Sequence, residues 1–462
     1  MADYLPHTGD EVAAMLAFLG LDDADGLFAA VPDALRLAGG LTLAPGEPEP
    51  DMLAHMEALA GANRAHRLVC FAGAGAYDHE VPPVVRALAG RSEFVTSYTP
   101  YQPEVAQGVL QAIFEYQTMV ARLAGLPVAN ASLYDGASAL VEAVNLGTAA
   151  AGRQGVWLSA GVHPHWRKVL ATYSSGSGHH LVDVALSEGR TVWPAATGGG
   201  GGGAEPPGVI VVGYPNYLGC VEDVGEARRI ADEQGALLVV VVDPVSAGIL
   251  RSAGDWGADV VVGEGQPFGT PLGFGGPYLG LFACTMEQVR RLPGRLVGET
   301  VDVQGRRAYV TTLRAREQDI RRERATSNVC TNETLMAVTA AVQLAWLGTS
   351  GLAEVALRCA RGTRYLRDAA LAVEGVEPLT GPTPVVRELA LRTAAPARTV
   401  VERMATEGFL AGVAISDLAG ELGDRSVGAD AAAHGLLVAV TERRTRAEID
   451  SYVAALEKAV RP

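Results

Sequence analysis

The sequence predicts an α/β protein built around a mostly parallel sheet. Between residues 68 and 330, short apolar runs alternate with helical stretches, as crossover connections between parallel strands require. The runs lack alternation of polar and apolar residues, which is typical of strands covered on both faces. With 462 residues, of which 48% are hydrophobic, the chain is long enough to bury a large core.

A helical arm is expected first, over residues 1–67. Thr8 and Glu11 can form a capping box just before the apolar run at 12–19. After a stretch rich in proline, a second helix is predicted over 51–60. Such an arm carries little core of its own.

A large domain is predicted next, over residues 68–330. Its candidate strands are the apolar runs at 68–71, 156–159, 181–184, 209–213, 237–242 and 260–263. The longest helix is expected over 104–124, where apolar residues recur on one face. Another helix is expected over 139–150. No Lys-Ser or Lys-Thr follows the glycine run at 198–203, which favours a surface insertion over a phosphate loop.

A smaller C-terminal α/β domain is predicted over residues 331–462. Its expected elements are helices at 334–347 and 399–407, strands at 413–416 and 436–440, and a last helix that the capping box Thr445–Glu448 opens.

Charge and composition exclude several classes of partner. A net charge of −15 makes binding to nucleic acid or to an anionic membrane surface unfavourable. The five cysteines show neither a disulfide framework nor zinc spacing, so no metal site is expected. No apolar run reaches the roughly 18 residues of a membrane span, and the first residues do not resemble a secretion signal. We therefore expect a cytoplasmic protein.

Two short patterns point to a ligand site in the large domain. Asp135 is a good N-cap, and Gly136 and Ala137 after it leave backbone N–H groups open to an anion. Asp243 follows a predicted strand, at the edge where α/β folds place their ligands. Taken alone, an ordinary capped helix is as good an interpretation of Asp135, and a capping role is the better one for Asp243.

The loop at 98–104 is the third candidate. Two tyrosines, Tyr98 and Tyr101, alternate with prolines that stiffen the chain just before the long helix. Rings with hydroxyl tips on a rigid loop favour contact with a partner or ligand, although burial in the core is the alternative.

Several unusual short motifs in the sequence resemble those of one enzyme family. They are residues 6–8, 73–79, 98–104 (YTPYQPE), 113–118 (IFEYQT), 134–137, 275–277 and 320–328 (IRRERATSN). In these motifs and along nearly its whole length, the chain resembles the P-protein of the glycine cleavage system. This glycine dehydrogenase decarboxylates glycine on pyridoxal phosphate. The chain is most similar to the N-terminal, or alpha, subunit (subunit 1) of the two-chain form.

The resemblance implies the aspartate-aminotransferase-like fold, fold type I of the pyridoxal-phosphate-dependent transferases. It places Asp135, Gly136 and Ala137 at the cofactor phosphate and Asp243 at the pyridine nitrogen. Gln266 stands where the lysine of the Schiff base would align, and an amide nitrogen cannot form that imine. Lys168 and Lys458 are the only lysines in the chain, and both are predicted to be solvated.

The function that the resemblance implies is therefore that of a subunit without the lysine. A beta subunit would hold pyridoxal phosphate covalently, and the two chains, expected as α2β2, would decarboxylate glycine and pass the aminomethyl group to the lipoyl arm of the H-protein. The chain alone is predicted to be inactive, with Tyr98 and Tyr101 contributed to the partner's site. Two alternatives stay open: a self-sufficient enzyme that uses Lys168, and a non-enzymatic scaffold or regulator with a degenerate pocket.

Overall fold

The computed structural model describes residues 6–37, 39, 41–194, 206–419 and 427–461. The predicted glycine insertion at 198–203 and the first five residues lie outside these ranges. The chain divides into two compact units, Met1–Arg64 and Ala65–Pro462. The further division of the second unit near residue 330 stays a prediction.

The first unit consists of short helices with no buried residue among those described. Helix α1 (Gly9–Leu19) has the predicted capping box: the Glu11 N–H donates to Thr8 Oγ1, and the Thr8 N–H donates to the Glu11 carboxylate. The second helix, α2 (Glu49–Ala62), begins and ends two residues beyond the predicted range. The described residues of this unit therefore form no buried core.

A seven-stranded sheet forms the centre of the second unit, in the order β2-β10-β9-β8-β7-β3-β4. The five strands from β9 to β4 run parallel, whereas β10 is antiparallel to both of its neighbours. Their bounds are β2 Val128–Ala129, β3 Gly155–Ser159, β4 His180–Val184, β7 Val209–Tyr214, β8 Leu237–Val242, β9 Val260–Glu264 and β10 Gly280–Cys284. Five of the six predicted strands are confirmed in this sheet.

The sixth prediction, a strand of this sheet at 68–71, is wrong. Only β1 (Val69–Cys70) forms there, and it pairs with β15 (Phe409–Leu410) far along the chain. Phe71 is buried in the cluster of the C-terminal region, whereas residues 68–70 are half-buried. An apolar pattern predicts burial, but it does not tell which sheet a strand joins.

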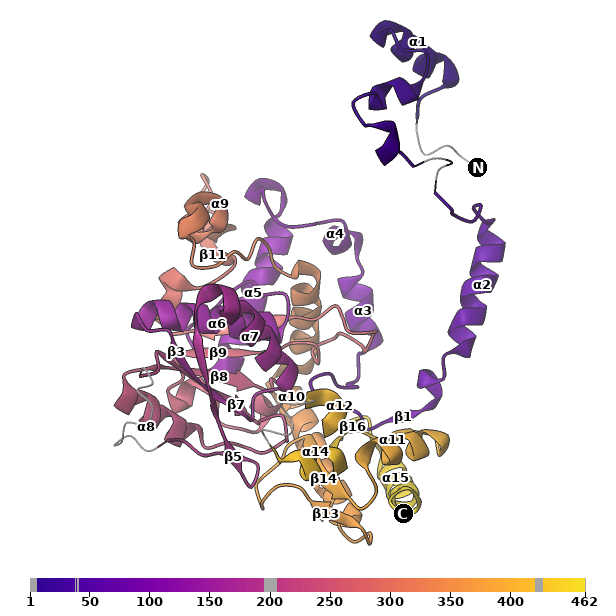
Figure 1. Ribbon diagram of the computed structural model, residues 1–462. Coiled ribbons are helices and arrows are strands. Elements are labelled where there is room, and N and C mark those ends of the chain that lie inside the picture. The colour runs from indigo at the N-terminus through magenta and orange to yellow at the C-terminus, as the bar shows by residue number, and fades with distance from the viewer. Residues whose placement is uncertain (1–5, 38, 40, 195–205, 420–426, 462) are drawn as a thin grey trace. The chain divides into compact units, whose positions relative to one another are not determined.

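Helices cover both faces of the central sheet (Figure 1). Residues of α6 (Gly136–Ala151) and α7 (Pro164–Ser177) pack with the strands in one apolar cluster. Residues of α5 (Gln107–Ala124), α8 (Val224–Gln234) and α10 (Thr334–Ala370) pack in the cluster on the other side. Burial on both faces is therefore confirmed for β3, β7, β8 and β9, whereas the edge strand β4 is mostly exposed.

Helix α10 is the one helix of the described residues that is long and apolar enough to cross a membrane. It is not continuous, because Gly348 has φ 61° and ψ −176°, outside the helical region. Leu344, before the break, and Leu366, after it, are both buried in cores of the second unit. We therefore interpret α10 as a broken core helix; its first part matches the prediction at 334–347.

A four-stranded antiparallel sheet in the order β13-β14-β17-β16 follows. The strand expected at 413–416 ends early, because its last residues begin a helix. Bounds here are β13 Val376–Pro378, β14 Glu388–Thr393, β16 Val413–Ala414, β17 Gly435–Ala439, α11 Ala397–Thr406, α12 Ile415–Ala419, α14 Ala429–His434 and α15 Arg446–Ala459. The other short elements are α3 Pro83–Ala89, α4 Ser92–Val95, α9 Gln318–Arg321, and the hairpins β5 Leu186–Ser187 with β6 Arg190–Thr191 and β11 Leu296–Val301 with β12 Arg307–Thr312.

Candidate functional site

A cavity of about 80 Å³ lies at the carboxyl ends of β7, β8 and β9. Parallel sheets place their ligands at this edge. Its polar lining includes Asp243 just after β8, Glu264 at the end of β9, and Tyr77, Arg387 and His163 from other segments. Asp243 thus lines a cavity at this edge of the sheet, while its role toward a ligand stays a prediction.

Asp243 is already paired inside the chain. Its Oδ1 lies 2.7 Å from an Nη2 of Arg387 and also accepts the Val245 N–H at 3.0 Å. The Arg387 residue is 4% exposed, and its guanidinium carbon lies 3.5 Å from the centroid of the Tyr77 ring. The Asp243 carboxylate is therefore already paired with a buried cation, the Arg387 guanidinium.

Backbone donors at the start of α6 are paired as well. The Asp135 side chain accepts the Ser138 N–H at 2.7 Å, as the predicted N-cap should. The Gly136 N–H donates to Glu264 Oε2 at 2.9 Å, and Glu264 Oε1 accepts the N–H groups of Gln266 and Leu279, both at 2.9 Å. Burial raises the pKa of Glu264 to about 7, although these three donors act in the opposite direction. One side chain thus joins the two loops that the sequence singled out.

Glycine is needed at position 136 because the Trp166 ring leaves no room for a side chain there. A Cβ built on this residue would lie 2.2 Å from a ring carbon of Trp166. The indole therefore packs directly against the first residue of α6.

Gln266 is held as a structural amide. The residue is 1% exposed, and its Oε1 accepts the Tyr77 N–H at 3.0 Å. Its Nε2 donates to the carbonyl oxygens of Thr270 at 2.7 Å and Tyr77 at 3.1 Å. All of these contacts are to backbone, so the side chain fastens two loops together. Neither lysine replaces it, since Lys168 is exposed on α7 and Lys458 pairs with Glu407 at the surface.

A second buried acid completes the wall of the cavity. Glu388 accepts the Tyr77 hydroxyl at 2.6 Å and the Ala74 N–H at 2.6 Å, and burial raises its pKa. His163 also lines the cavity and bonds to the same loop: its Nε2 donates to the Ala74 carbonyl at 2.8 Å, while Nδ1 accepts the His165 N–H at 3.2 Å. Burial lowers the pKa of His163 to about 4, so this ring is neutral.

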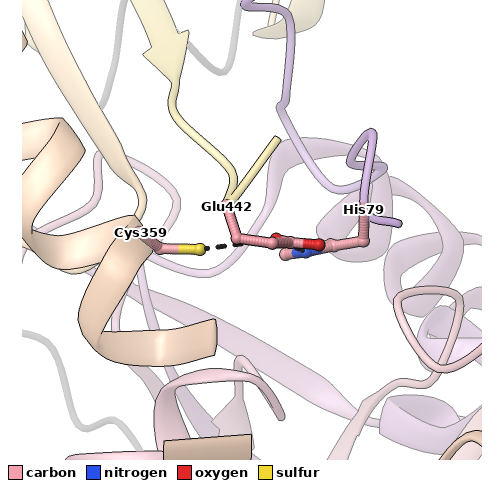
Figure 2. A group of neighbouring side chains, drawn as sticks. All are labelled: His79, Cys359 and Glu442. Atoms are coloured by element: carbon pink, nitrogen blue, oxygen red, sulfur yellow. Dashed lines mark hydrogen bonds and ion pairs between the residues drawn. The ribbon is translucent and has the colours of Figure 1, made fainter. Parts of the chain in front are cut away.

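Three possible metal ligands, His79, Cys359 and Glu442, lie within 4.8 Å of one another behind this wall (Figure 2). His79 Nδ1 lies 2.6 Å from Glu442 Oε2, and Arg387 Nη1 lies 2.5 Å from His79 Nε2. Because a guanidinium only donates, Nε2 must accept, and the ring proton must therefore reside on Nδ1. Burial and the Glu442 charge raise the pKa of the Cys359 thiol. With Nδ1 and Sγ both protonated, this geometry favours a hydrogen-bonded chain over a metal site.

The tyrosine loop lies on the surface, outside the lining of this cavity. Tyr98 is 71% exposed and Tyr101 is 59% exposed, whereas Thr99 between them is buried. The buried Arg295 contacts the Thr99 hydroxyl, and its guanidinium carbon lies 5.0 Å from the centre of the Tyr101 ring. The loop is thus anchored from below while both phenols face outward. Burial of the two rings in the chain's own core, the alternative interpretation, is wrong.

The structure brings together some of the predicted site residues and not others. Gly136 and Gln266 are joined through Glu264, Asp135 caps the helix that Gly136 begins, and Asp243 lines the cavity that Glu264 also lines. Glu264 and Arg387 were not predicted as site residues. An acid at the end of an otherwise apolar strand is a signal that could have identified Glu264. No local pattern marks Arg387, because its partner Asp243 comes from a distant strand.

Solved structures of low sequence identity define the class of fold. The chain superposes on a NifS-like protein from Rickettsia africae with a TM-score of 0.59 and 11% identity, covering 85% of this chain and 99% of that one. It superposes on a sphingosine-1-phosphate lyase from Burkholderia pseudomallei with a TM-score of 0.63 and 16% identity, covering 92% and 93%. The fold is that of the pyridoxal-phosphate-dependent enzymes of fold type I.

Closer matches define the family within that class. The sequence profile of the glycine cleavage system P-protein matches residues 2–383. Proteins named probable glycine dehydrogenase (decarboxylating) subunit 1 are 44% identical in Desulforamulus reducens and 47% identical in Moorella thermoacetica, covering 98% of this chain and 98–99% of theirs. A crystal structure of glycine decarboxylase (P-protein) in inhibitor-bound form matches with a TM-score of 0.88 and 44% identity, covering 99% and 100%. The chain belongs to the P-protein family of the glycine cleavage system.

The residues present do not fit pyridoxal phosphate. Gln266, at the position where the resemblance aligns the lysine, is a buried amide; the Gly136 N–H at the helix start expected to receive a phosphate is bonded to Glu264; and Asp243 is bonded to Arg387. The cavity of about 80 Å³ is also well below the roughly 300–1,000 Å³ of typical cofactor and ligand pockets.

Proposed function

We propose that this chain is the subunit of a heteromeric glycine dehydrogenase (decarboxylating, aminomethyl-transferring) that does not anchor the cofactor. The observation that carries the proposal is Gln266, a buried amide bonded only to backbone, at the position of the Schiff-base lysine. The full-length similarity to proteins named subunit 1 supports the same division of labour.

A beta-type partner subunit would hold pyridoxal phosphate on its own lysine and supply the decarboxylation of glycine. Together the chains would transfer the aminomethyl group to the lipoylated H-protein. We propose an α2β2 assembly in the cytoplasm.

The contribution of this chain would be a surface that completes the partner's site. Tyr98 and Tyr101 are exposed, yet their loop is fixed by Arg295 and by stiff prolines. A positioned phenol offers one donor and an apolar face, which suits orientation of a substrate or of the lipoyl arm. Proton transfer is not part of this role.

Co-expression with a beta-type chain tests the proposal directly. The isolated chain should show no exchange of glycine carboxyl carbon with bicarbonate, and borohydride reduction in the presence of pyridoxal phosphate should leave no stoichiometric adduct on it. The purified complex should show both exchange and an adduct on the beta chain. Exchange by the isolated chain, or a stoichiometric adduct at Lys168, would overturn the proposal. A complex that is inactive with every beta-type chain would favour the scaffold alternative.

A further inference from the structure

We infer that the degenerate pocket is self-liganded: Glu264, Arg387 and Gln266 supply from within the chain the three polar contacts that a phosphorylated cofactor would make. Each contact is present in the structure as a bond between groups of this chain. The polar groups of the pocket are then bonded mainly to one another, and Arg387 Nε is the one nitrogen or oxygen of these three side chains that is buried without a partner among the described residues.

The first contact is at the anion position. A helix start attracts a phosphate through its free N–H groups and its positive dipole end. In α6 the Gly136 N–H is taken by Glu264 and the Ser138 N–H by Asp135. The Glu264 carboxyl group is buried and accepts two further N–H groups from the loop that follows β9. An incoming phosphate would have to displace it and leave those donors unpaired.

The second contact is at the carboxylate that would receive a ring nitrogen. Asp243 pairs with Arg387 at 2.7 Å, and Arg387 also donates to His79, which in turn donates to Glu442. Because one guanidinium serves both Asp243 and His79, removing it for a ligand would break both bonds at once. Displacing the Arg387 guanidinium by a ligand is therefore energetically costly.

The third contact is at the covalent position. The Gln266 amide makes three hydrogen bonds to backbone, which a lysine ammonium could not reproduce because it has no acceptor. Restoring the lysine alone therefore does not restore the site, since the first two positions stay filled. A pocket that had only lost its lysine would regain cofactor binding when the lysine is restored, whereas a self-liganded pocket would not.

The inference rests on the proposed function, but its test is separate because it uses variants of this chain. Gln266→Lys in the full chain, incubated with pyridoxal phosphate and reduced with borohydride, should give no stoichiometric adduct at position 266 by peptide mass spectrometry. A stoichiometric adduct there, with Glu264 and Arg387 intact, would overturn the inference. It would leave the proposed function standing, because the wild-type chain has no lysine at that position.

Inorganic phosphate provides a second test. Glu264→Ala opens the N–H groups of Gly136, Gln266 and Leu279, so saturating phosphate should raise its melting temperature by a few degrees, as binding to the folded state does. Wild type and Glu142→Ala should show no such rise. Glu142 is the matched control, a glutamate also buried on α6 but away from the helix start, with a pKa that burial raises to about 7. Equal phosphate responses in all three proteins would overturn the inference.

Discussion

Substitutions in the tyrosine loop can distinguish a role of these residues in the complex from a role in the stability of the fold. Tyr98 and Tyr101 stand on the surface, yet the loop beneath them is anchored by Thr99 and Arg295. Removing an exposed ring creates no internal cavity, so its cost to stability is small.

Tyr101→Ala should therefore leave the melting temperature and the cofactor content of the complex unchanged while exchange falls on the order of 100-fold. The measurement is glycine–bicarbonate exchange, with thermal stability recorded on the same co-purified protein. Tyr173→Ala is the control, because that ring is 52% exposed on α7, a different part of the chain. Normal exchange in the Tyr101→Ala complex would remove this residue from the site.

The raised pKa of Glu264 gives stability a pH dependence. Burial raises this pKa from 4.5 in the unfolded chain to about 7, with a further contribution from the Asp135 charge; Tyr116 and Tyr278 are the other titratable groups nearby. Because folding favours the protonated acid, the stabilisation is complete below about pH 4.5 and is lost as the pH rises through 7.

Glu264→Gln removes the titrating group, so whatever its cost at pH 5 the variant should gain on wild type as the pH rises from 5 to 8, by on the order of 3 kcal/mol. Urea unfolding at both pH values measures the difference. Glu287→Gln, at an exposed carboxyl, should follow the wild-type profile. Parallel pH profiles for wild type and Glu264→Gln would contradict the prediction.

Local chemistry explains which site residues the sequence could predict. Asp135 is recognisable because an N-cap acts on residues three positions away, and its bond to Ser138 is present. Arg387 is not recognisable, since its bonds to Asp243 and His79 join segments that only the fold brings together. Residues whose partners are distant in the chain need the three-dimensional structure.

At the scale of elements, the arm carries a testable role. Isolated short helices are marginal in water, and α1 and α2 bury none of their described residues. Phe18, at 91% exposed, is an example of the apolar side chains left uncovered. Such a unit is expected to gain its stability from a partner surface.

Deleting the residues before Asp51 should weaken association with the beta chain by on the order of 10-fold or more, read by sizing chromatography at dilute concentration. The truncated chain should keep a cooperative thermal transition, because the unit Ala65–Pro462 has its own cores. Phe18→Ser should act in the same direction with a smaller effect. Unchanged complex formation after the deletion would count against the prediction.

The apolar pattern predicts the parallel strands β3, β7, β8 and β9 well because each is a largely buried apolar run, and it also finds the more exposed edge strand β4. It misses β10 (Gly280–Cys284), which is antiparallel and follows a loop rich in glycine and proline, and β2, which is only two residues long. It misplaces β1, because burial in either core gives the same apolar residues. Strand direction and sheet membership are set by tertiary packing, which local pattern does not encode.

At the scale of the whole molecule, one buried cation joins distant parts of the second unit. Arg387 bonds to Asp243 after β8 and to His79, which bonds to Glu442 after β17. Burial opposes ionisation of Glu442, but the hydrogen bond from His79 helps to hold its pKa at about 2. The central sheet and the C-terminal sheet are thus linked by charges as well as by apolar contacts.

Arg387→Met should lower the free energy of unfolding by about 3–5 kcal/mol, because it removes a buried cation and leaves Asp243, whose side chain is 15% exposed, without its ion pair. The double variant with Asp243→Asn should cost less than the two single variants together, since each single change strands a charge that the double change removes. Urea unfolding of the four proteins measures this coupling. Strictly additive costs would contradict it.

The absence of buried residues in the described part of the first unit has a consequence for hydrogen exchange. Amides there are held only by local helical bonds in contact with water, so they should exchange with deuterium at rates set by fraying of α1 and α2. Amides of β7 and β8, buried on both faces, should exchange only through global unfolding. The free chain should thus give two widely separated classes of exchange rate. Protection that appears over 6–62 only after the beta chain is added would map the interface onto the arm.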